Sequence, residues 1–303
     1  MKSITIPPWL NDGDLISIVT PASWIEEGPV LEAVKMLGAS GFRVRTGDHV
    51  FSRSGPFAGT DDERLSDMQE AVNDPEVRAV LCSRGGYGMS RIIDRLDFTS
   101  LRRHPKWFIG YSDITSLHLW LNNVCGLVSL HAEMPLNYSR PECSPLSYGS
   151  MIRALRGEPE PVSWDPAREA SFTVRGPVTG GNISLIYSMN GTPAQPVTDG
   201  AILFIEEIGE QLYHLDRMLT SMRMTGMLSH LSALLVGGME KITEGEHVFN
   251  RTVEEVIMDV AGSYGYPVLF NFPAGHISYN RPLYMGRTAI ISQQGKTATL
   301  DWA

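Results

Sequence analysis

The first half of the chain alternates short apolar runs with segments whose apolar residues recur every three or four positions. Length and β-branched content predict that the apolar runs are strands. The segments between them, including 30–37, 65–72, 92–96 and the stretch after Ser112, have helical spacing. Single helices between successive strands predict right-handed βαβ crossovers, and hence a mostly parallel, flavodoxin- or Rossmann-like sheet with flanking helices. The predicted strands lie at residues 15–19, 42–45, 77–83, 107–111 and 127–131.

The pattern changes after residue 138, where prolines become frequent up to residue 171 and only a short helical stretch intervenes. Beyond it, residues 201–207 and 231–239 are apolar enough to be buried strands, with a helix between them. A second helix follows a capping box formed by Thr252 and Glu255, and the last forty residues alternate as antiparallel strands with a Gln-Gly turn. We therefore expect an N-terminal domain over 1–140, a connection over 141–171 and a C-terminal domain over 172–303.

Three short polar or glycine-rich segments lie at the carboxyl ends of predicted parallel strands: TPAS (20–23), SRGGYG (83–88) and GYSD (110–113). Ligands bind at this carboxyl edge in parallel sheets. Ser112 lies where a strand meets a helix, so free helical N–H groups would face an oxyanion formed there. The arrangement is similar to a nucleophile elbow, although Ile114 replaces the last glycine of the G-x-S-x-G pattern. An ordinary helix N-cap explains the same residue, and this stretch alone leaves both interpretations open.

A serine nucleophile needs a base, and His276 differs from the other seven histidines. It lies in a loop between strand-like segments, next to Gly275 and close to Asn280, which makes it a credible base. Glu206 and Glu207 end a predicted strand and would orient that base. Adjacent side chains of a strand point to opposite sides, so we expect only one of the two to face the site. Two solvated carboxylates at a strand end remain the alternative.

Composition excludes some function classes. The 303-residue chain is 43% hydrophobic and carries a formal net charge of −9, which opposes general attraction to nucleic acid or anionic membrane. Three cysteines without CxxC spacing indicate a reducing compartment. The N-terminus does not have the pattern of a signal peptide, and no segment is long enough to span a bilayer. We therefore expect a cytoplasmic protein. Metal-binding motifs are missing, and so are the Rossmann and Walker motifs of nucleotide-binding sites, so we expect no metal site.

Six blocks in sequence order together resemble the LD-carboxypeptidase family and cover nearly the whole chain. They are GDLISIVTPAS, SRGGYGMSRIIDRLD, FIGYSDIT, GPVTGGNISLIYSMNGT, LFIEEIGEQLYHLDRML and FPAGHISYNRPLYMG. The resemblance implies a serine peptidase that needs no cofactor, with Ser112 as nucleophile, Glu206 as orienting carboxylate and His276 as base. It implies oxyanion donors in the backbone N–H groups of Asp113 and, by our choice, Gly86. It also implies a smaller, mostly β C-terminal domain, a site assembled between the two domains and a homodimer.

The substrate implied by this resemblance is the murein tetrapeptide, from which such enzymes release the terminal D-alanine in peptidoglycan recycling. The free carboxylate of that substrate needs a cationic pocket, for which Arg84, Arg217 and Arg281 are candidates by position. Surface or helix salt bridges explain these arginines equally well. Glu133 stands in an HAEMP block where family members commonly have His-Gly-Pro-Met. Its carboxylate would either pair with a substrate ammonium or change which peptides fit. Glu207 replaces a common aspartate.

Two other functions remain open at this point. A related immunity-type peptidase cleaves the C-terminal acyl-nucleotide conjugate of a microcin C-like toxin, and it should carry an aromatic side chain that stacks on the nucleobase. Trp120 and Trp164 are candidates for that contact, although core packing is the more ordinary explanation for both. A non-catalytic α/β peptide-binding protein, in which Ser112 only caps a helix, is the other alternative.

Overall fold

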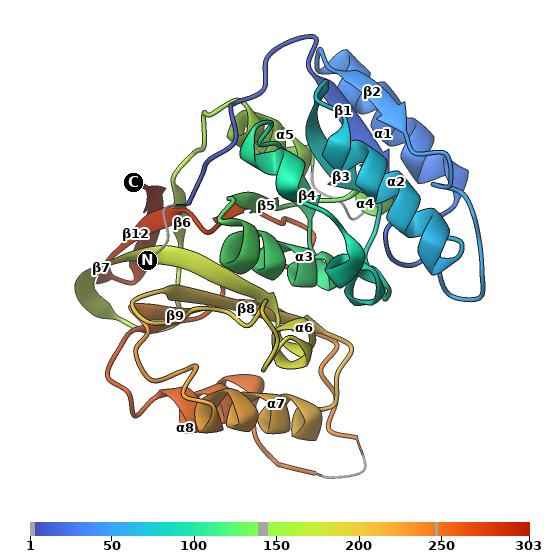
Figure 1. The fold of residues 1–303 in the computed structure, drawn as a ribbon. Helices are drawn as coiled ribbons and strands as arrows, with labels where there is room; N and C mark the ends of the chain where they lie inside the picture. Colours follow the sequence, from blue (N-terminus) through green and yellow to red (C-terminus); the bar gives the residue numbers. More distant parts are fainter. Residues whose placement is uncertain (1–3, 139–144, 246–247) are drawn as a thin grey trace.

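The predicted parallel sheet forms, and a strand from the far end of the chain completes it. The computed structural model describes residues 4–138, 145–245 and 248–303. In this part of the chain, six strands form a first sheet in the order β11–β5–β4–β3–β1–β2 (Figure 1). All neighbours are parallel except β11, which runs antiparallel to β5. The strands are β1 (Leu15–Val19), β2 (Arg43–Thr46), β3 (Val77–Cys82), β4 (Trp107–Gly110), β5 (Ser129–His131) and β11 (Leu283–Met285).

Both faces of this sheet are covered, which explains why its strands are continuous apolar runs. Along β1, Leu15 and Val19 belong to the core on one face, and Ile16 and Ile18 to the core on the other. Helices α1, α4 and α5 pack on the Ile16 side, whereas α2 and α3 pack on the Leu15 side. The helices are α1 (Glu27–Ala39), α2 (Asp61–Asn73), α3 (Thr115–Trp120), α4 (Pro135–Tyr138) and α5 (Pro145–Leu155).

The helix expected around residues 92–96 is a wrong prediction. The structure has two 3₁₀ turns there instead, η1 (Met89–Arg91) and η2 (Ile93–Arg95). The three apolar residues are all buried, as the pattern required: Ile92, Ile93 and Leu96. Short 3₁₀ turns bury such a group as well as an α-helix does, so the spacing of apolar residues alone does not distinguish them.

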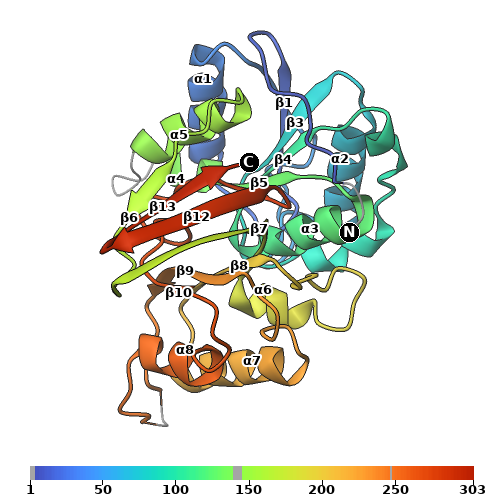
Figure 2. The ribbon, with the colours of Figure 1, turned by 90° about the vertical axis from the view of Figure 1, so that its left-hand side faces the viewer.

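A second sheet of seven strands is built from the C-terminal half, in the order β10–β9–β8–β7–β12–β13–β6 among the described residues (Figure 2). Strands β7 to β10 are parallel to one another, and β12, β13 and β6 are antiparallel, with the predicted Gln-Gly turn between β12 and β13. The strands are β6 (Val162–Trp164), β7 (Ala170–Asn182), β8 (Ile202–Ile208), β9 (Ala233–Glu240), β10 (Val268–Leu269), β12 (Thr288–Gly295) and β13 (Thr297–Trp302).

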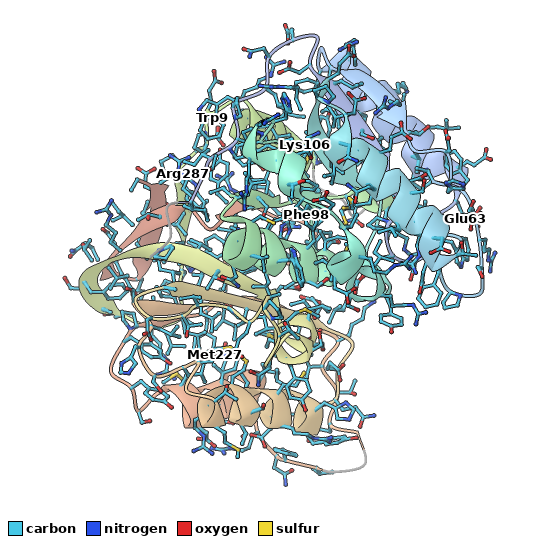
Figure 3. All side chains as sticks on the ribbon, in the orientation of Figure 1. Trp9, Glu63, Phe98, Lys106, Met227 and Arg287 are labelled. Atoms are coloured by element: carbon cyan, nitrogen blue, oxygen red, sulfur yellow. The ribbon has the colours of Figure 1, made fainter. Side chains whose placement is uncertain are left out.

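Helices cover one face of the second sheet, and the first sheet contacts the other. Met227 marks the core under the helices in Figure 3, where it lies between the sheet and α7. On the opposite face, Leu283 and Met285 of β11 join the core of the second sheet, while Tyr284 between them faces the core of the first. Strand β11 therefore joins both halves of the molecule. The helices are α6 (Ile183–Ser188), α7 (Leu212–Met224) and α8 (Val253–Ala261), and α8 starts at the predicted capping box.

Residues 141–171, expected to connect the two domains, contain regular structure of their own. Helix α5 contributes Met151 and Leu155 to the core of the first sheet, and β6 pairs with β13 at the edge of the second. The last two residues of this segment already belong to β7. Residues 141–144 lie outside the described residues. The connection is thus packed on both sheets.

Candidate active site

Ser112 occupies a strained turn at the carboxyl edge of the first sheet. It directly follows β4 and Tyr111, and it starts the 3₁₀ helix η4 (Ser112–Ile114) with φ of +65°. Few non-glycine residues adopt this left-handed conformation, which costs energy and is concentrated at functional sites. The next residue, Asp113, lies in the first turn of the helix, where backbone N–H groups have no intrahelical acceptor. The turn therefore places a half-buried hydroxyl beside a free N–H donor.

A glycine loop (residues 85–89) lies directly against this turn. A methyl group added to Gly85 would be 3.0 Å from Ser112 Oγ and 3.1 Å from the Asp113 nitrogen. Gly86 has φ of +102°, and a methyl group there would collide with Ser23 Oγ. Only glycines allow the loop to approach so closely. The sequence singled out Gly86, whereas the structure brings Gly85 into direct contact with the turn that carries Ser112.

The second sheet supplies a carboxylate and an imidazole to the same region. Glu206 lies near the end of β8, is fully buried, and its Oε2 is 2.6 Å from His276 Nδ1. Within the described residues, Glu206 Oε1 has no hydrogen-bond partner. A carboxylate on Nδ1 fixes the ring so that Nε2 is left to exchange a proton with a reacting group. This pair can serve as a base that a buried charge orients.

The neighbouring Glu207 has a different task. Its carboxylate accepts from Asn182 Nδ2 at 2.7 Å, from Ser184 N at 2.8 Å and Oγ at 2.7 Å, and from Ile208 N at 2.9 Å. Burial raises the pKa of Glu207, and these hydrogen bonds oppose that increase. The expectation that only one of the two glutamates faces the site agrees with this geometry, and Glu206 is the one that binds His276.

Contacts between the two halves bring the imidazole of His276 next to the turn that carries Ser112. The ring of His276 lies 4.9 Å from the ring of Tyr111, the residue that precedes Ser112. Thr115 Oγ1 accepts from the N–H of Asn182 at 3.0 Å, which connects the end of β7 to the start of α3. Among the described residues, Ser112 Oγ makes no hydrogen bond to His276. Catalytic hydrogen bonds are often longer before substrate binds.

The loop that carries His276 is held from both sides. Asn280 Oδ1 accepts from Gly275 N at 2.9 Å, and Asn280 N donates to Ser147 Oγ of α5 at 3.0 Å. Asn280 is fully buried, and a methyl group at Gly275 would be 2.8 Å from Glu206 Cβ. His276 is therefore positioned by the helix in the connection as well as by its own sheet.

Charges around the site shift several pKa values. Burial disfavours the charged ring of His276, but the hydrogen bond to Glu206 and the charges of Glu206, Glu207 and Glu133 outweigh it and raise its pKa. Burial raises the pKa of Asp113 to about 6, although N–H donors of the glycine loop and Arg64 oppose the shift. The electrostatic environment thus favours a protonated His276.

Two further histidines lie behind the site and remain neutral. Burial lowers the pKa of His118 to about 4, and its ring is held by Ser129 Oγ at 2.8 Å and the Gly110 carbonyl at 2.9 Å. Burial also lowers the pKa of His131 well below its usual value. The ring of His131 is 5.7 Å from that of Tyr111. Uncharged rings at these positions do not compete with His276 for the proton.

The structure separates the four predicted substrate-binding residues. Glu133 is buried, and its carboxylate accepts a hydrogen bond from Asn137 Nδ2. It lies close enough to His276 to contribute to the raised pKa of that histidine. Arg84 precedes the glycine loop and donates to the Trp24 carbonyl at 2.7 Å.

The other two arginines point to different partners. Arg281 forms an ion pair with Glu160 at 3.5 Å. Arg217 is exposed on α7, with its guanidinium 5.1 Å from the centre of the Tyr213 ring.

The two tryptophans considered for nucleobase stacking are packing residues. Trp120 packs against the cores on both sides of α3, and Trp164 packs on Phe272 and donates to the Phe270 carbonyl at 2.9 Å. Sequence reasoning missed Gly85, Thr115 and Ser147. Gly85 and Thr115 belong to recognisable motifs, but Ser147 stands in the proline-rich segment without any local signal.

Comparisons with known proteins identify the family of this chain. The LD-carboxypeptidase N-terminal domain matches residues 16–132, and the LD-carboxypeptidase C-terminal domain matches residues 175–291. A probable murein peptide carboxypeptidase of Bacillus subtilis is 35% identical over 97% of this chain and 94% of its own.

Solved structures show the same architecture. Muramoyltetrapeptide carboxypeptidase from Oxalobacter formigenes is 27% identical and superposes with a TM-score of 0.86, covering 95% of this chain and 98% of its own. A microcin C7 self-immunity protein in complex with aspartyl sulfamoyl adenosine has the same fold, with a TM-score of 0.88, 22% identity and 99% coverage of both chains.

Proposed function

The chain belongs to the LD-carboxypeptidase family, and we propose that it releases the terminal D-alanine from murein tetrapeptides by hydrolysing the L,D-amide bond. This reaction would serve peptidoglycan recycling. As a member of this family it is a serine-type carboxypeptidase. The observation that carries the assignment of residues is the buried Glu206–His276 pair, with 2.6 Å between Oε2 and Nδ1, beside the strained turn of Ser112.

In this mechanism His276 Nε2 removes the proton from Ser112 Oγ as the oxygen attacks the amide carbonyl. The negative charge that develops on the carbonyl oxygen is stabilised by the N–H groups of Asp113 and of the glycine loop, where Gly86 remains our proposed donor. His276 then gives its proton to the amine of the departing D-alanine. Water hydrolyses the resulting acyl-enzyme by the same steps, with His276 again as the base.

Glu206 holds the ring in the orientation that this proton transfer requires. Its negative charge also stabilises the imidazolium that forms when Ser112 loses its proton. The raised pKa of His276 has the same cause, and it means that the base is strong but becomes available only as the pH rises. Glu207 takes no part, since its oxygens already accept four hydrogen bonds from the neighbouring backbone and side chains.

For substrate recognition we propose Arg84 and Glu133. Arg84 is adjacent to the glycine loop, where a guanidinium would attract the free carboxylate of the substrate. Glu133 is near His276 and would attract the ammonium group of a diamino acid at the third peptide position. Arg281 and Arg217 are left out, because Arg281 pairs with Glu160 and Arg217 lies on the outer helix α7.

We also propose that the protein acts in the cytoplasm as a homodimer. The thiols of Cys82 and Cys125 are both free, in keeping with a reducing compartment, and Cys143 lies outside the described residues. None of the helices in the described residues is long and apolar enough to cross a membrane. Sedimentation of the purified chain should give about twice the mass of one 33.5 kDa protomer; a single-chain mass at micromolar concentration would contradict the dimer.

The decisive test is release of D-alanine from a free murein tetrapeptide, followed by mass spectrometry. The wild type should release it, and Ser112→Ala should not. Ser188→Ala is the matched control, because that serine is exposed at the end of α6 and should leave the rate unchanged. In a parallel assay, cleavage of an acyl-nucleotide conjugate measures the immunity-type activity. Absence of D-alanine release by the wild type, or equal release by Ser112→Ala, would remove the proposed function.

A further inference from the structure

The sequence of the glycine loop (residues 85–89) does not by itself restrict the loop to one conformation. Three of its five residues are glycines, and Gly86 and Gly88 have φ of +102° and +148°. Such a segment has many accessible conformations when nothing holds it. A donor that stabilises an oxyanion is effective only if it is already in place when the charge develops. Some other part of the chain must therefore restrict this loop.

Arg64 of α2 binds the loop from one side. The residue is 2% exposed, and its Nη1 donates to the Gly88 carbonyl at 2.9 Å and to the Pro21 carbonyl at 2.7 Å. Its Nη2 is paired with Asp61. A methyl group at Gly88 would be 2.7 Å from Arg64 Nη1, so the loop and the guanidinium are in direct contact.

The carboxylate of Asp113 binds the loop from the other side. It is 1% exposed, and its Oδ2 accepts from the Met89 N–H at 2.8 Å. Asp113 also follows Ser112, and its own N–H is one of the two proposed oxyanion donors. One residue therefore connects the nucleophile turn to the glycine loop. Arg64 is close enough to Asp113 to oppose the increase in its pKa that burial causes.

Buried charges of this kind need a reason, since removing them from water is unfavourable and an apolar pair of similar volume is often no less stable. Their best-attested use is to specify one geometry among several. Here each charge binds the loop backbone directly, one through a carbonyl and the other through an N–H. The pair leaves the loop little freedom to move relative to Ser112.

We propose that Arg64 and the carboxylate of Asp113 are positioning residues that fix the glycine loop beside Ser112 before substrate binds. This inference rests on the proposed function only in so far as the loop supplies an oxyanion donor. It requires that loss of either side chain loosens the loop in the free protein and slows the chemical step. Substrate binding should change much less, because both side chains are buried.

The test measures hydrogen exchange of the peptide spanning residues 84–89 in the free protein, together with kcat and KM for D-alanine release. Asp113→Ala and Arg64→Gln should speed exchange of this peptide and lower kcat by up to about 10²-fold, with a much smaller change in KM. Asp113→Asn should be intermediate, since the amide oxygen still accepts one N–H. Arg95→Gln is the matched control. Arg95 also pairs with an aspartate of α2, Asp62, at 2.6 Å, but this ion pair is exposed.

The outcomes separate this inference from the proposed function. If the wild type releases no D-alanine, the proposed function fails, yet the exchange data still show whether the two side chains hold the loop. Unchanged exchange in folded Asp113→Ala or Arg64→Gln overturns the inference, and so does faster exchange with an unchanged kcat. Thermal unfolding identifies any variant that fails to fold, in which case Asp113→Asn decides by the same two readouts.

Discussion

The two halves of the candidate site are held in place by different means. The nucleophile turn is fixed by the backbone: it follows a central strand, it is strained at Ser112, and Gly85 packs against it. The base lies on a long loop between β10 and β11, which side chains from several elements hold in position. The first half therefore depends mainly on backbone conformation and close glycine packing, whereas the second depends on side-chain hydrogen bonds from several elements. Substitutions should affect the two halves differently.

The same contrast exists within a single strand. Glu206 and Glu207 are adjacent on β8, yet Glu206 binds only His276 and retains an oxygen without a partner among the described residues. The carboxylate of Glu207 accepts hydrogen bonds from Asn182, from Ser184 and from the backbone N–H of Ile208. In the proposed mechanism, Glu206 supports proton transfer, whereas the hydrogen bonds of Glu207 stabilise the fold.

The largest effect on activity should come from substituting Glu206, and substituting Glu207 should affect stability instead. Glu206→Gln should lower kcat/KM by about 10⁴-fold, because the amide neither fixes the ring of His276 in the right tautomer nor stabilises its positive charge. Glu207→Gln should keep most of the activity but lose about 1–3 kcal/mol of unfolding free energy, because the amide nitrogen cannot accept hydrogen bonds. Steady-state kinetics and denaturant unfolding of both variants measure this. The reverse pattern would mean that the two roles have been exchanged.

The next largest effect tests the backbone half. Gly85→Ala should lower kcat by about 10²–10³-fold, since the new methyl group would lie against Ser112 Oγ and the Asp113 nitrogen where the oxyanion forms.

Gly28→Ala in α1 is the matched control, because nothing lies within 4 Å of the methyl group and φ is ordinary there. It should retain full activity and equal or higher stability. Full activity of a folded Gly85→Ala enzyme would argue against an oxyanion site at this contact.

The difference between the halves explains how much of the fold was predictable. Five strands of the first sheet, their parallel direction and the last hairpin follow from local patterns. Strand β11 was not predictable, because three residues after an Asn-Arg-Pro sequence carry no signal that they will pair with β5. Pairing between distant segments is decided by tertiary packing. The failed helix at 92–96 has the same cause, since its residues had to fill a core defined elsewhere.

The same limit applies to the candidate site. The position of Ser112 follows from the rule that ligands bind at strand ends. The expectation that one glutamate of β8 faces the site follows from the alternation of side chains along a strand. Which glutamate it is depends on Asn182 and Ser184, which occupy the other one. The contact of His276 with Glu206 spans seventy residues. Only resemblance to a family, and not a local pattern, connected them.

A smaller effect is expected from loosening the base half. Asn280→Ala should lower kcat/KM by about 10- to 100-fold, since it removes the acceptor for Gly275 N and lets the imidazole move from its working position. Ser147→Ala should act in the same direction and more weakly, because it removes one hydrogen bond from the connection.

Asn73→Ala, at the exposed end of α2, serves as the control and should have no effect on activity. Equal activities of the Asn280 and Ser147 variants and the wild type would show that the loop needs no support from α5.

The smallest effect is a pH dependence in which activity and stability change in opposite directions. The base must be neutral to accept the Ser112 proton, so kcat/KM should rise with pH through the pKa of His276, above the ordinary value of 6.5. A histidine with a raised pKa stabilises the fold fully below its unfolded pKa, and this stabilisation is lost as the pH rises through the folded pKa. Glu206→Gln removes the main cause of the raised pKa, and should move the acid limb of the residual activity to lower pH and flatten the change in unfolding free energy. An acid limb that stays in place in this variant would show that Glu206 does not tune the base, which leaves the buried pair with a structural role alone.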